Sequence, residues 1–378
     1  MDKIPSKIRV LYVHNITQIS GGERSLLNLW EHLDRQQFEP FLMVPQEGEL
    51  GRAAFTLGVE RTYLEIQQLS LKNIFKVLKT AFRLWKFLRL KQIRIIHSYS
   101  PRNNILSALV GKLSGVSVIW HERNLIYKEE PDRSRQFFFL PERIICNSKA
   151  VAQRFENQKH FLKKVRVVHN GVNLERFKFL KDDFGLRSSL GLDGVKVVGM
   201  VSNLNKRKGL EFLIQRVPLV VEKIPNVKFL IVGGEFPDEG GGRLKELQNL
   251  VESLGIQKHV IFTNFQDNVC SYLNILDLFV HVTTKEACSR AILEAMACSR
   301  AVIAMNDGGN PELVDDQKTG ILIDPNDSET FAVKIIELLL NDQKRTMMGR
   351  QGRLRVEEFF DVRRNARETQ RIYLEVTN

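Results

Sequence analysis

A repeated alternation of short apolar runs with longer helical patterns is the feature that most limits how this sequence can fold. The apolar runs have the length of strands, and the segments between them have the spacing of helices. Such alternation is typical of βαβ units, which build a parallel sheet covered by helices. The runs form two series: IRVLYV, FEPFLMV, IRIIHS, VSVIWH and RIICNS, then VKVVGMV, VKFLIVGG, HVIFTNF, DLFVHV, AVIAM and TGILI.

The length of the chain and the break between the two series indicate two domains. A chain of 378 residues exceeds what one hydrophobic core usually serves. The stretch FGLRSSLGLDG between the series is rich in glycine and serine, which suits a linker. We therefore predict an α/β protein of two doubly wound domains, residues 1–180 and 181–358. Residues 359–378 are expected to form a final helix.

Charge is distributed unevenly along the chain. Residues 1–180 hold 30 Lys and Arg against 16 Asp and Glu, whereas residues 181–378 hold 26 against 28. The first half is therefore expected to meet an anionic partner, whether a membrane surface, a nucleic acid or an acidic substrate.

Other features of the composition indicate where the chain works. The start MDKIPSKIRV lacks the apolar stretch of a signal peptide, and no apolar run approaches the ~18 residues that span a bilayer. A cytoplasmic location is expected. Four scattered cysteines imply neither a disulfide framework nor a zinc site.

The loops that follow the strands hold the candidate functional residues of the first half. Open parallel sheets bind ligands outside the carboxyl ends of their strands. Gly21 and Gly22 follow the first strand and precede a helix, so they either let a ligand approach the backbone or form a plain left-handed turn. His121 ends the strand VSVIWH, where it is either catalytic or structural.

In the second half, three cations follow the strand VKVVGMV. Lys206, Arg207 and Lys208 come just before a helical pattern, where they are either a solvated charge run or a set that neutralises a diphosphate. Cations there would stabilise a nucleoside diphosphate leaving group. The loop NDGGNPELV (306–314) either faces the same site or is a tight turn.

Two glutamates lie eight positions apart in KEACSRAILEAMA. The run 290–297 consists mostly of strong helix formers, so Glu286 precedes the helix and Glu294 lies on it. The backbone of Ser289, Arg290 and Ala291 then offers the N–H groups and the positive dipole end that bind phosphate. Side chains lean toward a helix's N-terminus, which aims Glu294 at the same place. The alternative is a surface helix with two solvated acids.

Together these motifs resemble glycosyltransferase family 4. The resemblance covers nearly the whole chain, and the motifs come in the family's order and spacing. They are SGGE (20–23), IIHSYSP (95–101), WHE (120–122), VVHNGVN (167–173), NLNKRKG (203–209), FLIVGG (229–234), VIFTNF (260–265), the E-x7-E of EACSRAILEAMA, and DGGNPE (307–312). The resemblance implies the B-type glycosyltransferase fold: two Rossmann-like domains facing across a cleft, with the last helix returning to the first domain.

The resemblance also assigns roles to residues. It implies that Glu294 holds the ribose of a nucleotide-sugar donor, that Glu286 and His121 lie near the transferred sugar, and that Lys208 binds phosphate. The N–H groups of 289–291 would face the diphosphate, and the base would lie near Phe265. Transfer with retention by a front-face mechanism is implied, in which the leaving phosphate accepts the acceptor's proton. No cofactor and no metal are expected, because Lys208 and the helix terminus supply the positive charge.

This sequence departs from the family pattern at several positions. Asn203 stands where arginine is common, so Lys206 or Arg207 is expected to supply the missing donor-binding charge. Ala287 and Cys288 replace glycine and an aromatic residue. Further departures are Ser299, Ala301 and Tyr99, the last where a second histidine is common. They leave the nucleotide base, the donor sugar and the linkage open.

Residues 71–94 suggest a membrane contact. They contain eight basic residues and no acidic one. Lys72, Lys76, Lys79, Arg83 and Lys86 form one helical stripe; Ile74, Leu78, Trp85 and Leu88 lie opposite and are expected to pack on the sheet. A basic stripe bordered by Phe75, Phe82 and Phe87 suits anionic lipid, and a glycan acceptor on a lipid carrier would fit such a location.

Two alternatives remain at this stage. One is a nucleotide-sugar epimerase or phosphorylase of the same fold, although no lysine context suited to a pyridoxal cofactor stands out. The other is a polyanion- or nucleic-acid-binding protein that uses the basic half; no recognition motif for nucleic acid is evident. A glycosyltransferase of surface polysaccharide or glycolipid synthesis, peripheral on the inner face of the membrane, is the preferred interpretation.

Overall fold

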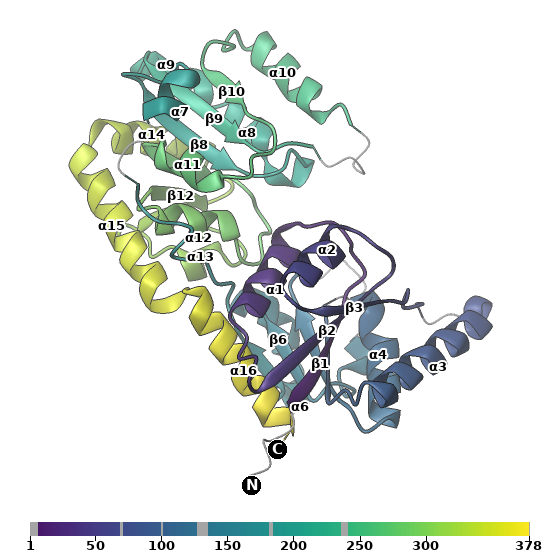
Figure 1. Ribbon diagram of the computed structural model, residues 1–378. Coiled ribbons are helices and arrows are strands. Elements are labelled where there is room, and N and C mark those ends of the chain that lie inside the picture. Colours follow the sequence, from purple (N-terminus) through teal and green to yellow (C-terminus); the bar gives the residue numbers. More distant parts are fainter. Residues whose placement is uncertain are drawn as a thin grey trace. The chain divides into compact units, whose positions relative to one another are not determined.

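The computed structural model describes residues 7–68, 71–99, 101–126, 135–180, 184–235 and 241–377, and it divides the chain into two compact units (Figure 1). The first unit comprises Met1–Gly171 and Val362–Asn378, and the second comprises Val172–Asp361. Ser100 of the IIHSYSP motif, the predicted start of the second domain at 181, and the last residue of the final segment lie outside the described residues.

The first unit is built on a seven-stranded sheet in the order β3-β2-β1-β4-β5-β6-β7. All neighbouring strands pair in parallel, as the alternation of runs predicts. The strands are β1 (Ile8–Val13), β2 (Phe38–Val44), β3 (Glu60–Tyr63), β4 (Ile95–Ser98), β5 (Ser117–Glu122), β6 (Arg143–Cys146) and β7 (Val165–Val167).

Helices connect the strands of the first unit, and the last helix of the chain packs with them. The helices are α1 (Gly21–Glu31), α2 (Glu49–Thr56), α3 (Ile74–Leu90), α4 (Pro101–Leu113), α5 (Lys149–Ala152), α6 (Lys159–Leu162) and α16 (Val362–Thr377). Short 3-10 turns lie at Leu71–Asn73, Arg135–Phe137 and Gln153–Phe155. Buried apolar residues of β1, β2 and α1 form one core with Ala366, Ile372 and Tyr373 of α16.

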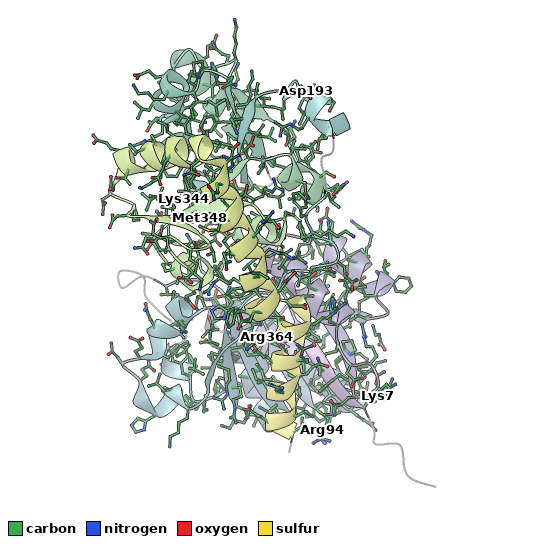
Figure 2. All side chains as sticks on the ribbon, turned by 90° about the vertical axis from the view of Figure 1, so that its left-hand side faces the viewer. Lys7, Arg94, Asp193, Lys344, Met348 and Arg364 are labelled. Atoms are coloured by element: carbon green, nitrogen blue, oxygen red, sulfur yellow. The ribbon has the colours of Figure 1, made fainter. Side chains whose placement is uncertain are left out.

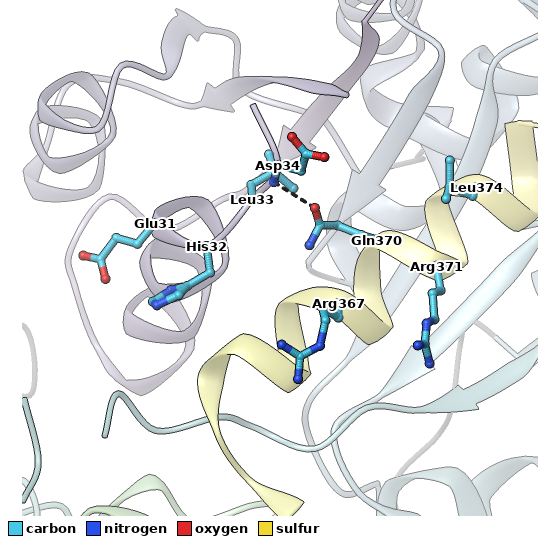
Figure 3. A pocket seen from close by; sticks show the side chains of 8 residues that line it. All are labelled: Glu31, His32, Leu33, Asp34, Arg367, Gln370, Arg371 and Leu374. Atoms are coloured by element: carbon cyan, nitrogen blue, oxygen red, sulfur yellow. Dashed lines mark hydrogen bonds between the residues drawn. The ribbon is translucent and has the colours of Figure 1, made fainter. Parts of the chain in front are cut away.

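Helix α16 makes hydrogen bonds as well as apolar contacts with the rest of the first unit. The backbone N–H of Asp34, just after α1, donates to Gln370 Oε1 at 2.8 Å, in a pocket that also has Arg367 and Arg371 on its wall (Figure 3). Near the other end of α16, Arg94 donates to the carbonyl of Thr377 at 3.4 Å (Figure 2). These bonds join residues more than 280 positions apart, so α16 completes the first unit.

The second unit has a six-stranded parallel sheet in the order β10-β9-β8-β11-β12-β13. The strands are β8 (Lys196–Val201), β9 (Val227–Val232), β10 (Val260–Phe262), β11 (Leu278–His281), β12 (Ala301–Met305) and β13 (Gly320–Ile323). The helices are α7 (Phe184–Ser189), α8 (Leu210–Ile214), α9 (Val217–Lys223), α10 (Arg243–Ser253), α11 (Val269–Asn274), α12 (Arg290–Ala297), α13 (Asn310–Leu313), α14 (Ser328–Leu340) and α15 (Asp342–Phe359).

Both faces of this second sheet bear a buried core. One core gathers residues of α8, α9, α10 and α14 with alternate residues of β8, β9 and β11, and it includes Met348 of α15 (Figure 2). The other gathers α11, α12 and the opposite residues of the same strands. A sheet covered on both faces explains why its strands read as continuous apolar runs.

The domain boundary differs from the predicted one. The first unit ends at Gly171 rather than at residue 180, and FGLRSSLGLDG does not act as a linker. Its first six residues form α7, and Leu186, Leu190 and Leu192 pack into a core of the second unit. The overlooked sequence signal was the regular spacing of leucines along this glycine-rich segment. Such leucines indicate packing against a core, which a linker does not require.

The prediction of which side of the helix at residues 71–94 is buried is also partly wrong. Leu88 is buried as expected, together with Val77 and Leu84. Ile74, Leu78 and Trp85 are instead exposed, by 40%, 58% and 40%. The helix therefore buries a stripe at 77, 80, 84 and 88 and presents a second apolar stripe to solvent, and Figure 1 shows the N-terminal half of α3 extending beyond the sheet of the first unit.

Candidate active site

Strand order places the candidate residues of the second unit beside one another. β8 and β11 are neighbours in the sheet although four helices (α8 to α11) and two strands separate them in the sequence. This is the switch point of the sheet, where the connections leaving the two strands diverge and open a crevice. The loop after β8 contains Asn203 to Gly209, and the loop after β11 contains Glu286.

Lys206–Lys208 form a 3-10 turn whose geometry is set by two flanking residues. Asn205 Oδ1 accepts a hydrogen bond from the N–H of Arg207 at 3.0 Å. Gly209 has a φ of 70°, and a Cβ there would lie 3.0 Å from the carbonyl oxygen of Val282 in the β11 loop. Glycine at 209 therefore lets the lysine turn lie against the loop that carries Glu286.

Lys208 and Glu286 form an ion pair, with 2.8 Å between Nζ and Oε2. Their side chains are 27% and 22% exposed, so the pair lies in a part-buried position that solvent still reaches. Burial is the largest single influence and raises the pKa of Glu286. The charges of Lys208, His281 and Arg207 and the hydrogen bond from Lys208 together outweigh burial, so the pKa lies below its ordinary value. Glu286 is therefore held ionised.

The predicted glycine loop at 306–314 holds the backbone of Glu286. The carbonyl of Glu286 accepts a hydrogen bond from the N–H of Gly309 at 2.8 Å, and Asp307 Oδ2 accepts one from the N–H of Lys285 at 2.6 Å. Gly308 has a φ of 59°, and a Cβ there would lie 2.3 Å from the Glu286 carbonyl oxygen. The loop thus fixes the backbone position of Glu286.

Helix α12 begins at Arg290 and ends at Ala297, as the sequence predicts. Ser289 is its N-cap, and its Oγ accepts a hydrogen bond from the N–H of Ile292 at 3.3 Å. Glu294 is 8% exposed and accepts a hydrogen bond from Arg290 Nη2 at 2.7 Å. The E-x7-E pattern is therefore one acid before the helix and one buried on it.

Several buried polar atoms around this pair have no hydrogen-bond partner within the described part of the chain. Buried polar atoms usually have hydrogen-bond partners, so a group of buried polar atoms without them indicates that a bound molecule supplies the missing hydrogen bonds. They are Ser202 Oγ, Asn203 Oδ1, Arg290 Nη1, Asn310 Oδ1 and both ring nitrogens of His281.

His281 was not among the predicted site residues. It ends β11, is 2% exposed, and has a pKa lowered to about 4, mainly by burial; Glu286 raises that pKa and Lys208 lowers it. A histidine at the end of an apolar strand was visible in DLFVHV. The sequence gives no sign that its ring nitrogens are left without partners.

The remaining predicted residues of the second unit are more exposed. Lys206 has a side chain that is 75% exposed and lies 3.9 Å from Glu246, and Arg207 donates to Asn205 Oδ1 at 3.4 Å. Phe265 is 51% exposed and packs against Gly234, where a Cβ would lie 2.9 Å from its ring. Of the three predicted cations, Lys208 is the one that pairs with Glu286.

In the first unit, Gly21 and Gly22 open helix α1 rather than forming a left-handed turn. The carboxylate of Glu23 accepts hydrogen bonds from the N–H of Ser20, at 2.9 Å, and from the Ser20 hydroxyl. His14 Nδ1 accepts from the N–H of Ile16, and His14 Nε2 lies 3.2 Å from Glu23 Oε1. This buried His14–Glu23 pair, which the sequence analysis missed, fixes the loop between β1 and the two glycines.

His121 lies at the carboxyl end of β5, in a buried aromatic group. Its ring centroid is 4.8 Å from that of Tyr99 and 5.2 Å from that of His97. His97 is on β4, which neighbours β1 at the switch point of this sheet. His121, Gly21 and Gly22 thus belong to the first unit, and the other predicted site residues belong to the second.

Neither a metal-binding cluster nor a membrane-spanning helix is found within the described ranges. No group of three or more His, Cys, Asp or Glu side chains in these ranges is placed to hold a metal ion. None of the helices in the same ranges is both long and apolar enough to cross a bilayer.

Two parallel α/β units, each with candidate residues at the switch point of its sheet, form the architecture of B-type glycosyltransferases. The chain belongs to the family 4 and group 1 glycosyltransferases. The family described as "Glycosyltransferase Family 4" matches residues 19–176, and "Glycosyl transferases group 1" matches residues 185–355. It is therefore a glycosyltransferase, rather than the epimerase or phosphorylase left open by the sequence.

Individual relatives agree with this assignment. The chain is 24% identical over 399 residues to UDP-Gal:alpha-D-GlcNAc-diphosphoundecaprenol alpha-1,3-galactosyltransferase of Escherichia coli, covering 100% of this chain and 99% of the relative. It is 30% identical over 232 residues to N-acetyl-alpha-D-glucosaminyl L-malate synthase of Bacillus anthracis, covering 60% and 59%. HepE of Anabaena, solved in complex with UDP, has the same fold, with a TM-score of 0.87, 21% identity and coverage of 97% of this chain and 100% of HepE.

Proposed function

We propose that this glycosyltransferase moves a sugar from a UDP-sugar to a lipid-linked glycan acceptor, with retention at the anomeric carbon. The observation that carries the proposal is the Lys208–Glu286 pair, which lies at the β8–β11 switch point beside the start of α12. Buried polar atoms without partners in the described residues surround it, as expected of a site built for a polar substrate.

The donor's diphosphate is the group best suited to Lys208. Phosphate oxygens carry more charge than one carboxylate, so they draw Lys208 away from Glu286 and also receive N–H groups at the start of α12. Glu294 would then accept hydrogen bonds from the ribose hydroxyls, and Asn203, Arg290 and Asn310 have polar atoms available for the rest of the donor. This accounts for the positions of both acids of E-x7-E.

The transfer step follows from the same charges. The bond between the anomeric carbon and the phosphate oxygen breaks, and a bond from that carbon to the acceptor oxygen forms on the same face. The proton of the acceptor hydroxyl passes to the leaving phosphate. Lys208 stabilises the negative charge on the leaving diphosphate, and the ionised Glu286 favours the positive charge that develops on the sugar.

Uracil as the base is supported by the relatives. The E. coli relative is named for a UDP-galactose donor, and HepE was solved with UDP. We propose that the base lies near Phe265, where Gly233 and Gly234 bring the end of β9 close to neighbouring backbone. A Cβ on Gly233 would lie 1.9 Å from the carbonyl oxygen of Ser202.

A lipid-linked acceptor is supported by helix α3. Its outward stripe consists of four large apolar residues at helical spacing, Phe75, Leu78, Phe82 and Trp85, which are 85%, 58%, 61% and 40% exposed. The basic stripe runs alongside: Lys72, Lys76, Lys79, Arg83 and Lys86. An amphipathic helix of this kind binds anionic bilayers, and each cation near the surface adds about 1 kcal/mol.

A peripheral position on the inner face of the membrane would bring the enzyme to its acceptor. The name of the E. coli relative includes a diphosphoundecaprenol-linked acceptor. We therefore propose an acceptor glycan on a polyprenyl diphosphate, and a role in surface polysaccharide or glycolipid synthesis.

A ligand screen followed by product analysis tests the function. Melting temperatures are measured with UDP-, GDP- and ADP-sugars; a ligand specific to the folded state stabilises it by about 2.7 kcal/mol at a hundredfold excess over its Kd. The stabilising donor is then radiolabelled and mixed with polyprenyl-diphosphate-linked sugars. A labelled, longer lipid-linked glycan with retained configuration is expected, and transfer to water alone or an epimerised donor would contradict the proposal.

A further inference from the structure

A string of hydrogen-bonded side chains crosses the core of the first unit and ends at His121. The hydroxyl of Tyr373 donates to the hydroxyl of Tyr12 at 3.0 Å. His97 Nδ1 lies 2.6 Å from the Tyr373 hydroxyl, and His97 Nε2 lies 3.2 Å from His121 Nδ1. The string joins β1, β4 and β5 to α16, the last helix of the chain.

The direction of the first bond fixes every other proton in the string. A tyrosine hydroxyl has one proton. Because Tyr373 gives that proton to Tyr12, it can only accept from His97, so Nδ1 of His97 bears a hydrogen. The Nε2 of a neutral His97 then has a lone pair, which accepts from the Nδ1–H of His121.

The burial of the string supports neutral rings. Tyr12, His97 and Tyr373 are fully buried and His121 is 5% exposed. Burial lowers the pKa of His97 to about 3, with Arg123 acting in the same direction. Burial, Arg123 and His97 likewise hold the pKa of His121 well below its ordinary value.

The last residue of the string, His121, has a ring nitrogen without a hydrogen-bond partner in the described residues. His121 Nε2 is buried and has no hydrogen-bond partner in the ranges that the structure describes. Tyr99 packs on both imidazoles, with centroids 4.6 Å from His97 and 4.8 Å from His121, which restricts rotation of the rings. A fixed ring with one free nitrogen is suited to receiving a group from outside the protein.

We propose that Tyr373 and His97 are positioning residues that keep His121 in the Nδ1–H tautomer, so that its Nε2 accepts a hydrogen bond from a hydroxyl of the sugar substrate. The substrate part rests on the proposed function. A sugar hydroxyl can donate a hydrogen bond to a ring nitrogen that bears no hydrogen. In the opposite tautomer, Nε2 of His121 would bear a hydrogen and would bind a hydrogen-bond acceptor instead. Tautomer control by a neighbouring group is a known determinant of histidine function.

Nuclear magnetic resonance of the free protein tests the tautomer directly, without any substrate. Protein labelled with ¹⁵N-histidine and deuterated elsewhere gives long-range proton–nitrogen correlations that distinguish protonated from bare ring nitrogens. His97→Asn and His121→Asn variants assign the signals. In the wild type, His121 is expected to bear its proton on Nδ1. A proton on Nε2 of His121 would overturn the proposal.

Three variants that each remove one hydroxyl give different expected results. Tyr373→Phe removes the acceptor of the His97 proton, so His121 becomes a mixture of tautomers. Tyr12→Phe frees the Tyr373 hydroxyl to donate to His97, which reverses the string and moves the His121 proton to Nε2. Tyr99→Phe is the matched control: its ring contacts both histidines but its hydroxyl takes no part in the string, so the wild-type tautomer remains.

Activity completes the test. Tyr373→Phe is expected to lower kcat about tenfold or more, as an incorrect histidine tautomer does in other enzymes, while KM for the donor stays near the wild-type value. A Tyr373→Phe variant with the wild-type tautomer, or with wild-type kcat, would overturn the proposal. If the wild-type protein bound no nucleotide sugar, the proposed function would fail while the tautomer result still stood.

Discussion

Lys208 and Glu286 neutralise each other across the ends of two adjacent strands, with 2.8 Å between Nζ and Oε2. The strands β8 and β11 are adjacent because the order in which successive strands join the sheet reverses between them. In the proposed function, Lys208 is kept paired with Glu286 until the donor's diphosphate arrives. Donor binding as we propose it breaks this pair, which would free Glu286 to face the sugar.

Lys208→Met is expected to reduce kcat by about a hundred- to a thousandfold, because the loss of one preorganised group that stabilises developing charge has this size of effect. Lys208→Arg keeps the charge and is expected to retain more activity. Steady-state kinetics with the donor identified by thermal shift measures both. A matched control is Lys206→Met, since the Lys206 side chain is 75% exposed and should matter little.

The two glutamates are expected to differ in their effects. Glu286→Gln removes the partner of Lys208, so UDP binds at least as tightly as to the wild type while transfer falls about a hundredfold or more. Glu294→Gln weakens UDP binding about tenfold or more, because a hydrogen bond to a charged group contributes about 1.5–3 kcal/mol. Calorimetric titration with UDP separates them, and equal loss of affinity in both variants would contradict the assignment.

Buried His281 is expected to make the fold sensitive to acid. Its pKa is about 4 in the folded protein against an ordinary 6.5, so below pH 6.5 the unfolded chain binds a proton that the folded one does not. Its contribution to stability is therefore lost as pH falls from about 6.5 toward 4, amounting to about 2 kcal/mol at pH 5.

Urea unfolding at pH 7 and pH 5 measures this loss. His281→Gln should reduce the difference in the free energy of unfolding between the two pH values. His160→Gln, at an exposed position, serves as the control and should leave the difference unchanged. An unchanged difference in the His281 variant would show that other groups cause the acid sensitivity.

The outward stripe of α3 is expected to bind anionic lipid. Phe75→Ser with Phe82→Ser should abolish sedimentation with vesicles containing phosphatidylglycerol, while the wild type sediments with them at low salt and not with neutral vesicles. Phe55→Ser on α2 is the control, because Phe55 is 69% exposed but lies on another helix. Equal recovery of the wild type with neutral and anionic vesicles would rule out the lipid contact.

Transfer is expected to proceed without a divalent metal. Lys208 and the start of α12 supply positive charge where we propose that the diphosphate binds. Extensive dialysis against EDTA should leave kcat unchanged, with added magnesium giving no increase. Activity that disappears in EDTA and returns with a divalent ion would contradict this expectation.

The sequence predicts the repeating parts of this molecule well. Eleven apolar runs coincide with strands, and α12 has the predicted bounds. β3 and β7 were missed because both are short and ERTY is largely polar, and only their pairing with a neighbouring strand identifies them. The exposed face of α3 was misassigned because it has two apolar stripes, and periodicity alone does not tell which one is buried.

Candidate site residues could be named from the sequence where a motif contains them and not where the fold brings distant residues together, and their roles in binding stay predictions. Lys208, Glu286 and Glu294 follow from strand-end position and family pattern. The bond between His97 and Tyr373 joins residues 276 positions apart, and a tyrosine in the last helix has no sequence feature that indicates it. His281 is similar, because its missing partners appear only once the neighbouring loops are placed.

The discontinuous first unit has a consequence for synthesis. Because α16 belongs to that unit, the ribosome has to translate all of Val172–Asp361 before the segment that completes the earlier unit emerges. Until α16 emerges, the apolar residues of α1 and β1 that pack against it are exposed in the nascent chain. Chaperones that shield apolar surface during translation would find a target there until α16 emerges and completes the core.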